Sequence, residues 1–138
     1  MKKAITILTI CLLTFTGMQT AEAQTKEETI TWIKEKLEKY GGFEYIYFKD
    51  VQVSPCKISF TASYPSSSYS QSFNPSTVKE WKIASNKKYI YADANVIHSV
   101  DSDGDVDTYS IFGIKNGEAN IHERMIKALL HLATFCNE

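Results

Sequence analysis

The chain has 138 residues, of which 43% are hydrophobic, a length and composition that suit one ordinary globular domain. Its 15 lysines and arginines nearly balance its 16 aspartates and glutamates, so the formal net charge is −1. This balance excludes the chain-wide basic surface typical of nucleic-acid or anionic-membrane proteins, and no nucleic-acid partner is expected.

Residues 1–23 have the three-part layout of a secretory signal peptide. Lys2 and Lys3 precede an uncharged apolar run, and residues 21–23 have the sequence Ala-Glu-Ala, whose small first and last side chains suit signal peptidase. The apolar run is shorter than the ~20 residues that a membrane-spanning helix needs. The sequence therefore predicts an exported protein, periplasmic or secreted, that is cleaved before Gln24 and has no stable membrane insertion afterwards.

The mature part, residues 24–138, is expected to form a single globular domain. It keeps 13 basic and 15 acidic residues, so its formal net charge is −2. Two cysteines remain in it, Cys56 and Cys136. An oxidising compartment would let them form a disulfide, and the alternative is that both are small buried hydrophobic residues.

Residues 25–40 have the pattern of an amphipathic helix. Thr25 and Glu28 have the spacing of a capping box at its start, and the glycines at 41–42 suit its end. Trp32 lies off the apolar stripe, so it is either part of a second packing surface or an exposed aromatic that can bind a partner. The stripe consists of Ile30, Ile33, Leu37 and Tyr40.

From residue 43 to residue 114 the apolar period changes to two, which predicts antiparallel strands. A two-residue loop at Asp103-Gly104 would set His98 opposite Tyr109 on an apolar face. The Ser- and Pro-rich residues 64–76 form the longest irregular stretch. The predicted strands, about seven, are residues 43–53, 56–63, 69–73, 78–85, 88–93, 96–101 and 106–114.

A second helix is predicted from Asn120, where Asn120 and Glu123 repeat the capping pattern. Its apolar face is wide, which indicates that it lies over the sheet. The fold class is therefore α+β: an N-terminal helix, a curved antiparallel sheet or partly open barrel, and a C-terminal capping helix. The apolar face consists of Ile121, Met125, Ala128, Leu129, Leu132, Phe135 and Cys136, widened by Ile126, Leu130 and Ala133.

In the number of strands and the closing helix, whose residues 123–132 have the sequence ERMIKALLHL, the chain resembles small exported bacterial domains with a pleckstrin-homology-like build. The resemblance is architectural and covers most of residues 43–136. It implies the fold and no activity, because fold alone does not transfer function. The chain also lacks the basic cluster between the first strands, so the resemblance does not imply binding of lipid headgroups.

Four alternating aspartates offer hard oxygen ligands of the kind that calcium prefers. An EF-hand loop has glycine at its sixth position and glutamate at its twelfth, whereas counting from Asp101 gives Val106 and Phe112. A hairpin without metal explains the segment better, and a calcium-stiffened structural domain is kept as an alternative. These weak metal candidates are Asp101, Asp103, Asp105 and Asp107.

An enzymatic alternative is a small hydrolase or thiol enzyme. His98 would act as general base on its apolar face, and Cys56 with an aspartate would complete a nucleophile set. No local motif surrounds Cys56, so a histidine bonded at the edge of the core is the simpler interpretation of His98.

The function favoured by the sequence is a non-enzymatic binding or interaction module without a cofactor. Residues 64–76 combine hydroxyls and aromatic rings, a composition that suits adaptable binding surfaces, although a solvated loop has the same composition. The expected partner is a protein or a glycan, and the oligomeric state is left open. The predicted binding residues are Tyr64, Tyr69, Phe73 and Trp32.

Overall fold

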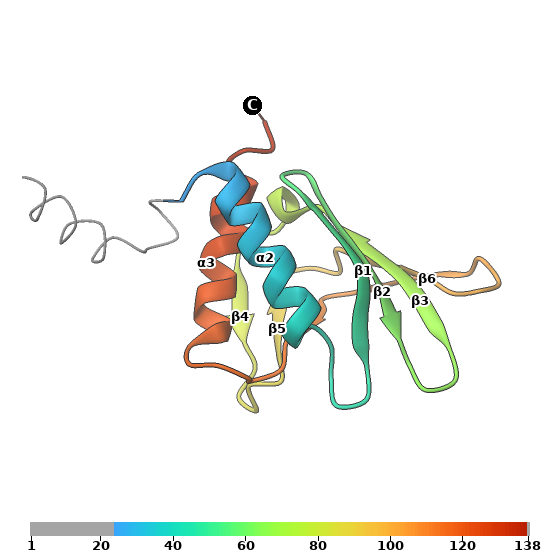
Figure 1. Cartoon of the computed structure of the whole chain (residues 1–138). Helices are drawn as coiled ribbons and strands as arrows, with labels where there is room; N and C mark the ends of the chain where they lie inside the picture. The colour runs from blue at the N-terminus through green and yellow to red at the C-terminus, as the bar shows by residue number, and fades with distance from the viewer. Residues whose placement is uncertain (1–23, 138) are drawn as a thin grey trace, which may run out of the picture.

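The computed structural model describes residues 24–137, which form two helices, eight strands and one 3-10 turn (Figure 1). The predicted signal peptide, residues 1–23, lies outside the described residues. Helix α2 spans Lys26–Tyr40 and helix α3 spans Ile121–Ala133. Neither of these two helices is long and apolar enough to cross a membrane.

The strands form two antiparallel sheets, one of five strands in the order β1-β2-β3-β6-β7 and one of three in the order β4-β5-β8. The α+β class with a helix at each end is therefore confirmed, and the expected β layer is divided into two sheets. The strands are β1 (Tyr47–Ser54), β2 (Lys57–Ser63), β3 (Ser68–Phe73), β4 (Trp81–Ile83), β5 (Tyr89–Ala92), β6 (Ile97–Val100), β7 (Val106–Tyr109) and β8 (Ile111–Gly113), with the 3-10 turn η2 (Pro75–Thr77) after β3.

Helix α2 begins and ends as its sequence predicts. The Thr25 hydroxyl accepts the N–H of Glu28 at 3.2 Å, and the Glu28 carboxylate accepts the N–H of Thr25 at 3.0 Å, which completes the capping box. After the helix, Gly42 has a φ of +113°, where an added Cβ would lie 2.0 Å from the carbonyl oxygen of Ile46. This position therefore requires glycine.

Helix α3 buries most of the predicted apolar face, with Leu130 left 42% exposed, but does not have the predicted cap. Leu129 and Leu132 are fully buried, and the helix packs against α2, η2, β4 and β5. Asn120 lies in the left-handed conformation, with φ 57° and ψ 28°, and its side chain makes no capping hydrogen bond. The capping prediction for Asn120 and Glu123 is wrong, because a capping side chain needs an extended backbone at that residue.

The centre of the core is an aromatic cluster around Phe112. The Phe112 ring lies 5.7 Å from Phe48, 5.2 Å from Phe73 and 6.2 Å from Trp81, measured between centroids. These rings come from both sheets, so the cluster joins the sheets beneath the helices. Phe73 is only 3% exposed. Its packing in the core leaves little of this ring for contact with a partner, which does not favour Phe73 as a binding residue.

The β6–β7 hairpin has a three-residue loop where a two-residue loop was predicted. Asp101 donates its N–H to the carbonyl of Asp105, and the Asp101 carboxylate accepts the N–H groups of Asp103 and Asp105. Gly104 has a φ of +88°, as this loop type requires. The register moves by one residue, because the aspartate side chain stabilises the longer loop.

This shift changes the face on which His98 lies. His98 pairs with Thr108, while Ile97 pairs with Tyr109. Ile97 and Ser99 are buried, and His98 is exposed on the opposite face. The prediction that His98 lies on an apolar face opposite Tyr109 is wrong, because a one-residue slip moves every side chain to the other face.

The chain passes from one sheet to the other at Ser110. The predicted strand 106–114 is split there into β7, which pairs with β6, and β8, which pairs with β5. The Ser110 carbonyl accepts the N–H of Ala92 at 2.8 Å, which ties this bend to the smaller sheet. Strand β7 is left at the edge of the larger sheet, and all four of its residues are exposed.

Candidate functional site

Three tyrosines, Tyr64, Tyr69 and Tyr109, define a surface that we call the tyrosine cluster. The Tyr64 and Tyr69 rings meet edge to face with centroids 5.1 Å apart. Tyr64 is 37% exposed and Tyr109 is 44% exposed, whereas Tyr69 is partly buried. The cluster therefore offers aromatic area and phenolic hydroxyls to solvent on a formed sheet.

The strand register explains why these side chains share one face. Tyr69 and Phe73 lie four residues apart on β3, so they point to the same side of the sheet. Phe73 pairs with the buried Ile58 of β2, so both lie on the same face of the sheet. On β7, Tyr109 pairs with the buried Ile97 of β6. The cluster thus lies on the inner face of the larger sheet, beyond the part that the core covers.

Residues 64–76, predicted as a binding loop, are mostly ordered secondary structure. The N–H of Tyr64 donates to the carbonyl of Ser67 at 2.8 Å, which makes a tight turn between β2 and β3. Strand β3 then lies in the centre of the larger sheet (Figure 1). The strand predicted at residues 69–73 is confirmed as β3, and the irregular part of the stretch is shorter than predicted, because backbone pairing on both sides outweighs the weak strand preference of its serines.

The environment of the cluster changes the ionisation of Tyr64. Burial raises the pKa of the Tyr64 phenol, and the neighbouring Tyr69 and Tyr109 phenols raise this pKa further. A tyrosine phenol is already neutral at physiological pH, and this raised pKa favours the neutral form of Tyr64 further. A neutral phenol can both donate and accept a hydrogen bond, which suits recognition of polar groups on a partner.

Trp32 is not part of this surface. It lies half-buried on α2, and its ring is 5.8 Å from the Lys36 ammonium and 5.2 Å from the Arg124 guanidinium. These contacts favour the packing interpretation of Trp32. The Lys36 cation comes from the same helix, whereas the Arg124 cation comes from α3 and so joins the two helices across the Trp32 ring.

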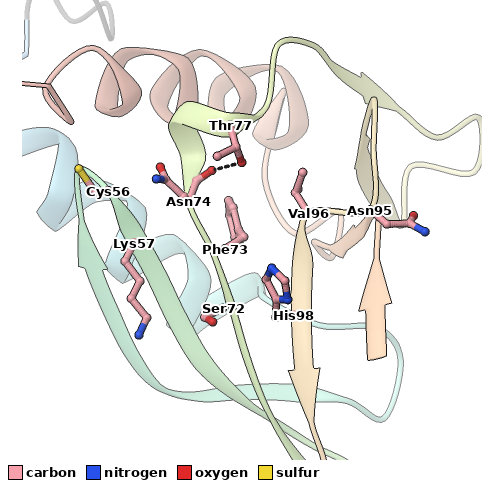
Figure 2. Close-up of a pocket in the computed structure, with 9 residues that line it drawn as sticks. All are labelled: Cys56, Lys57, Ser72, Phe73, Asn74, Thr77, Asn95, Val96 and His98. Atoms are coloured by element: carbon pink, nitrogen blue, oxygen red, sulfur yellow. Dashed lines mark hydrogen bonds between the residues drawn. The ribbon is translucent and has the colours of Figure 1, made fainter. Parts of the chain in front are cut away.

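A groove of about 400 Å³ brings together other residues that the sequence analysis names, and Figure 2 shows its lining. His98 lines it from β6, and Cys56 lies at the far end beyond β2 (Figure 2). Ser72 and Asn74 come from the predicted binding stretch 64–76, and the other polar side chains around the groove were not predicted. The polar side chains beside His98 and Cys56 are Lys57, Ser72, Asn74, Thr77 and Asn95, together with the apolar Phe73 and Val96.

The groove does not assemble the nucleophile set of the enzymatic alternative. Cys56 and Cys136 are joined in a disulfide with an S–S distance of 2.07 Å, so the Cys56 sulfur is not a thiolate. Within residues 24–137, no carboxylate lines the groove to orient His98. Ser72, which pairs with His98 across the strands, brings a hydroxyl into the groove, but no carboxylate of its lining orients the imidazole as a catalytic set usually requires.

The four aspartates of the calcium alternative lie around the β6–β7 hairpin. The Asp101 carboxylate is occupied by the backbone N–H groups of Asp103 and Asp105. In the part of the chain that the structure describes, no three His, Cys, Asp or Glu side chains are grouped to hold a metal ion. The hairpin interpretation accounts for Asp101 and Gly104 without a metal.

A comparison with known protein families, curated proteins and solved structures finds no match to this chain. The pleckstrin-homology-like resemblance therefore stays a prediction, and the functional argument rests on the surfaces themselves.

Sequence reasoning identified two members of the tyrosine cluster and missed the third. Tyr109 lies 40 residues after Tyr69. The predicted two-residue loop places it opposite His98 instead of beside Tyr69. The signal that was available is Asp101, whose carboxylate can accept N–H groups of the turn and so favours the longer loop. The three-residue loop pairs Tyr109 with Ile97 and brings it to the face of Tyr69.

Proposed function

We propose that this protein is an exported, non-enzymatic binding module that contacts a protein or glycan partner through the tyrosine cluster. The observation that carries the proposal is that Tyr64 and Tyr109 expose 37% and 44% of their surface beside Tyr69 on an otherwise ordered sheet. Tyrosine provides a large contact area at low entropic cost, because its side chain has two rotatable bonds.

The position of the cluster supports this role. Val106 and Tyr109 lie on edge strand β7 and are exposed, so neither of them is needed to close the core. An edge strand also has unpaired backbone groups that a partner can approach. Aromatic rings beside free backbone groups are a combination that fits both protein and carbohydrate ligands.

The disulfide supports the export part of the proposal. The bond between Cys56 and Cys136 closes a separation of 80 residues, and Cys56 is exposed. Disulfides of this structural kind persist in oxidising compartments and are rare in reducing ones. Export through a signal peptide at residues 1–23 delivers the chain to such a compartment.

Binding is tested with a double variant, Tyr64→Ser with Tyr109→Ser, compared with Tyr45→Ser as a matched control. Tyr45 is 73% exposed and lies outside the cluster. Each protein is cross-linked in the native envelope, and the bound partners are quantified by mass spectrometry and glycan analysis. We expect the double variant to lose a partner that both the wild type and Tyr45→Ser retain.

A partner that the wild type and the double variant bind equally would show that the cluster is not the contact surface. Equal loss in the Tyr45→Ser control would show that general surface aromaticity, rather than this cluster, is responsible.

Processing is tested by intact-mass measurement of the protein recovered from expressing cells. We expect a mass that begins at Gln24, and a further increase when the protein is reduced and alkylated that corresponds to Cys56 and Cys136. A full-length mass, or two cysteines that alkylate without reduction, would contradict export with a closed disulfide.

A further inference from the structure

A pocket of about 350 Å³ is lined by residues from three separate turns of the chain. One turn precedes β1, one joins β4 to β5, and one follows β8. The pocket is distinct from the tyrosine cluster and from the groove of Figure 2. Its lining consists of Phe43, Glu44, Asn86, Lys87, Lys88, Lys115 and Asn116.

Backbone hydrogen bonds hold these turns together. Gly42 donates to the carbonyl of Gly113 at 2.9 Å, Ile114 donates to Lys88 at 3.1 Å, and Lys115 donates to Tyr40 at 2.7 Å. Two of these bonds join the end of α2 and its following turn to the end of β8, and the third joins the end of β8 to the start of β5, so the pocket is formed before any ligand arrives. A preformed site loses less conformational entropy on binding.

The pocket concentrates positive charge on a chain whose net charge is −1. Three lysines line it against a single glutamate. Glu44 is paired with Lys88 at 2.7 Å, whereas Lys87 and Lys115 have no carboxylate partner among residues 24–137. The local charge is therefore uncompensated and attracts anions.

The environment of Lys115 disfavours the charged form of its side chain. Its ammonium lies 3.8 Å from the centroid of the Tyr47 ring, and burial lowers the pKa of its side chain. A half-buried ammonium has lost part of its water without gaining a counter-ion. An anionic group in the pocket would supply the missing hydrogen-bond acceptor.

Aromatic rings continue from the pocket onto the outer face of the smaller sheet. Phe43 and Tyr89 meet edge to face at 5.8 Å, and Tyr89 lies 6.4 Å from Tyr91, measured between centroids. Tyr89 and Tyr91 flank the buried Ile90, so they point away from the core. The rings form a partly exposed platform beside the lysines.

We propose that this pocket binds an acidic carbohydrate, a sugar chain that carries carboxylate or sulfate groups. Lys87 and Lys115 pair with the anionic groups. The amides of Asn86 and Asn116 both donate and accept hydrogen bonds, as vicinal sugar hydroxyls require. The Phe43 and Tyr89 rings cover the apolar C–H face of a sugar ring.

This inference does not depend on the tyrosine cluster, and the ligand chemistry follows from the combination of groups. Lysines alone would suit any anion, including an acidic peptide. A row of rings next to amides favours a stiff ligand that presents both a flat apolar face and hydroxyls, which is the chemistry of a pyranose chain. An acidic peptide is therefore an outcome to be tested.

The test is a calorimetric titration of the mature protein with four polymers of similar size. Polygalacturonate carries carboxylates, heparin carries sulfates, dextran is a neutral glycan, and polyglutamate is an acidic peptide. We expect binding of one or both acidic glycans, weakened by salt because the lysines are partly solvated. We expect at least about tenfold weaker binding of dextran and polyglutamate.

Variants then assign the site. Lys115→Met keeps the apolar stem and removes the charge, and it is expected to weaken binding at least about tenfold, as expected for a charge-assisted hydrogen bond. Lys115→Arg keeps the charge and should restore most of the affinity. Lys49→Met, an exposed lysine on β1 outside the pocket, is the control and should bind like the wild type.

Thermal melting of each variant separates lost binding from lost folding. If neither acidic glycan binds, or if polyglutamate binds as tightly with the same dependence on Lys115, the proposal is wrong. Equal binding by Lys115→Met and the wild type with unchanged melting would also overturn it. None of these outcomes bears on the tyrosine cluster, whose variants are different.

Discussion

The two edges of the five-stranded sheet have opposite environments. At the β1 edge, α2 packs on the strand, and Phe48 and Val51 are 7% and 2% exposed. At the β7 edge, Val106 and Tyr109 are 60% and 44% exposed. One sheet thus has an edge that contributes to the core and an edge that is free to contact a partner. This difference predicts that stability and the proposed binding can be altered separately in this molecule.

The β1 edge is reinforced in ways that the β7 edge is not. The disulfide joins Cys56, in the turn after β1, to Cys136, which follows α3. Glu118 accepts hydrogen bonds from Lys36 of α2 and Arg124 of α3. Changes at the covered edge should therefore affect the free energy of unfolding, and changes at the open edge should affect binding.

The largest effect is expected from removing the disulfide with Cys56→Ser and Cys136→Ser together. The bond closes a separation of 80 residues, and a loop of that length stabilises the folded state by about 4 kcal/mol through the unfolded chain. Chemical denaturation of the variant and the wild type measures this difference. Reducing the wild type should give the same loss, and a loss below about 1 kcal/mol would show that the covered edge does not need the bond.

A pair of glycine substitutions compares the edges directly. Gly42→Ala places a Cβ 2.0 Å from the Ile46 carbonyl oxygen at a φ of +113°, and about 3 kcal/mol or more of destabilisation is expected. Gly104→Ala in the β6–β7 loop has no atom within 4 Å of the added Cβ, so strain at its φ of +88° should cost only about 1 kcal/mol.

Thermal and chemical denaturation measure both glycine variants. Equal losses would remove the distinction between the covered edge and the open edge, because the crowding around Gly42 would then have no energetic consequence.

A smaller effect is expected from Glu118→Gln. The pKa of Glu118 is lowered from 4.5 to about 2, chiefly by the hydrogen bond from Lys36 and in smaller part by the one from Arg124. Because the Glu118 side chain is 24% exposed, solvent weakens these pairs, and we expect a loss of about 1 kcal/mol at neutral pH.

The pH dependence of Glu118 follows from the direction of its shift. A carboxyl group whose pKa is lowered by folding stabilises the protein above its ordinary pKa. This stabilisation should therefore decline as the pH falls from 4.5 towards about 2. Denaturation across this range should show a steeper decline for the wild type than for Glu118→Gln, and parallel curves would argue against the assigned role.

The smallest effect on stability is expected from Tyr109→Ser at the open edge. Tyr109 is 44% exposed, and a substitution on such a surface usually changes the free energy of unfolding by less than about 0.5 kcal/mol. Denaturation should find the variant close to the wild type while partner binding falls. A large loss of stability would mean that the tyrosine cluster is part of the core.

The helices and the fold class were predictable because their signals are local. The stripe of Ile33 and Leu37 and the capping box at Thr25 depend on residues within one or two turns of each other. The cap of α3 was not predictable in this way, because the conformation of Asn120 depends on how the preceding turn approaches the sheet.

The candidate sites depend on long-range pairing that a sequence pattern does not record. Lys87 and Lys115 are 28 residues apart and meet because β5 pairs with β8. Tyr109 joins Tyr69 through the register of β6, which a single extra loop residue changes. Phe73 shows the converse, since an aromatic residue in a serine-rich stretch proves to be part of the core.

The separation of the paired cysteines has a consequence for biogenesis. In the proposed export, the N-terminal part of the chain emerges first, so Cys56 would reach an oxidising compartment while the 80 residues up to Cys136 are still in transit. During that interval the Cys56 thiol, in the turn after β1, would be reactive, and its partner Cys136 would not yet be present. Thiol–disulfide oxidoreductases would then act on an intermediate that can form the wrong disulfide, because any second exposed cysteine in the compartment would compete for the Cys56 sulfur.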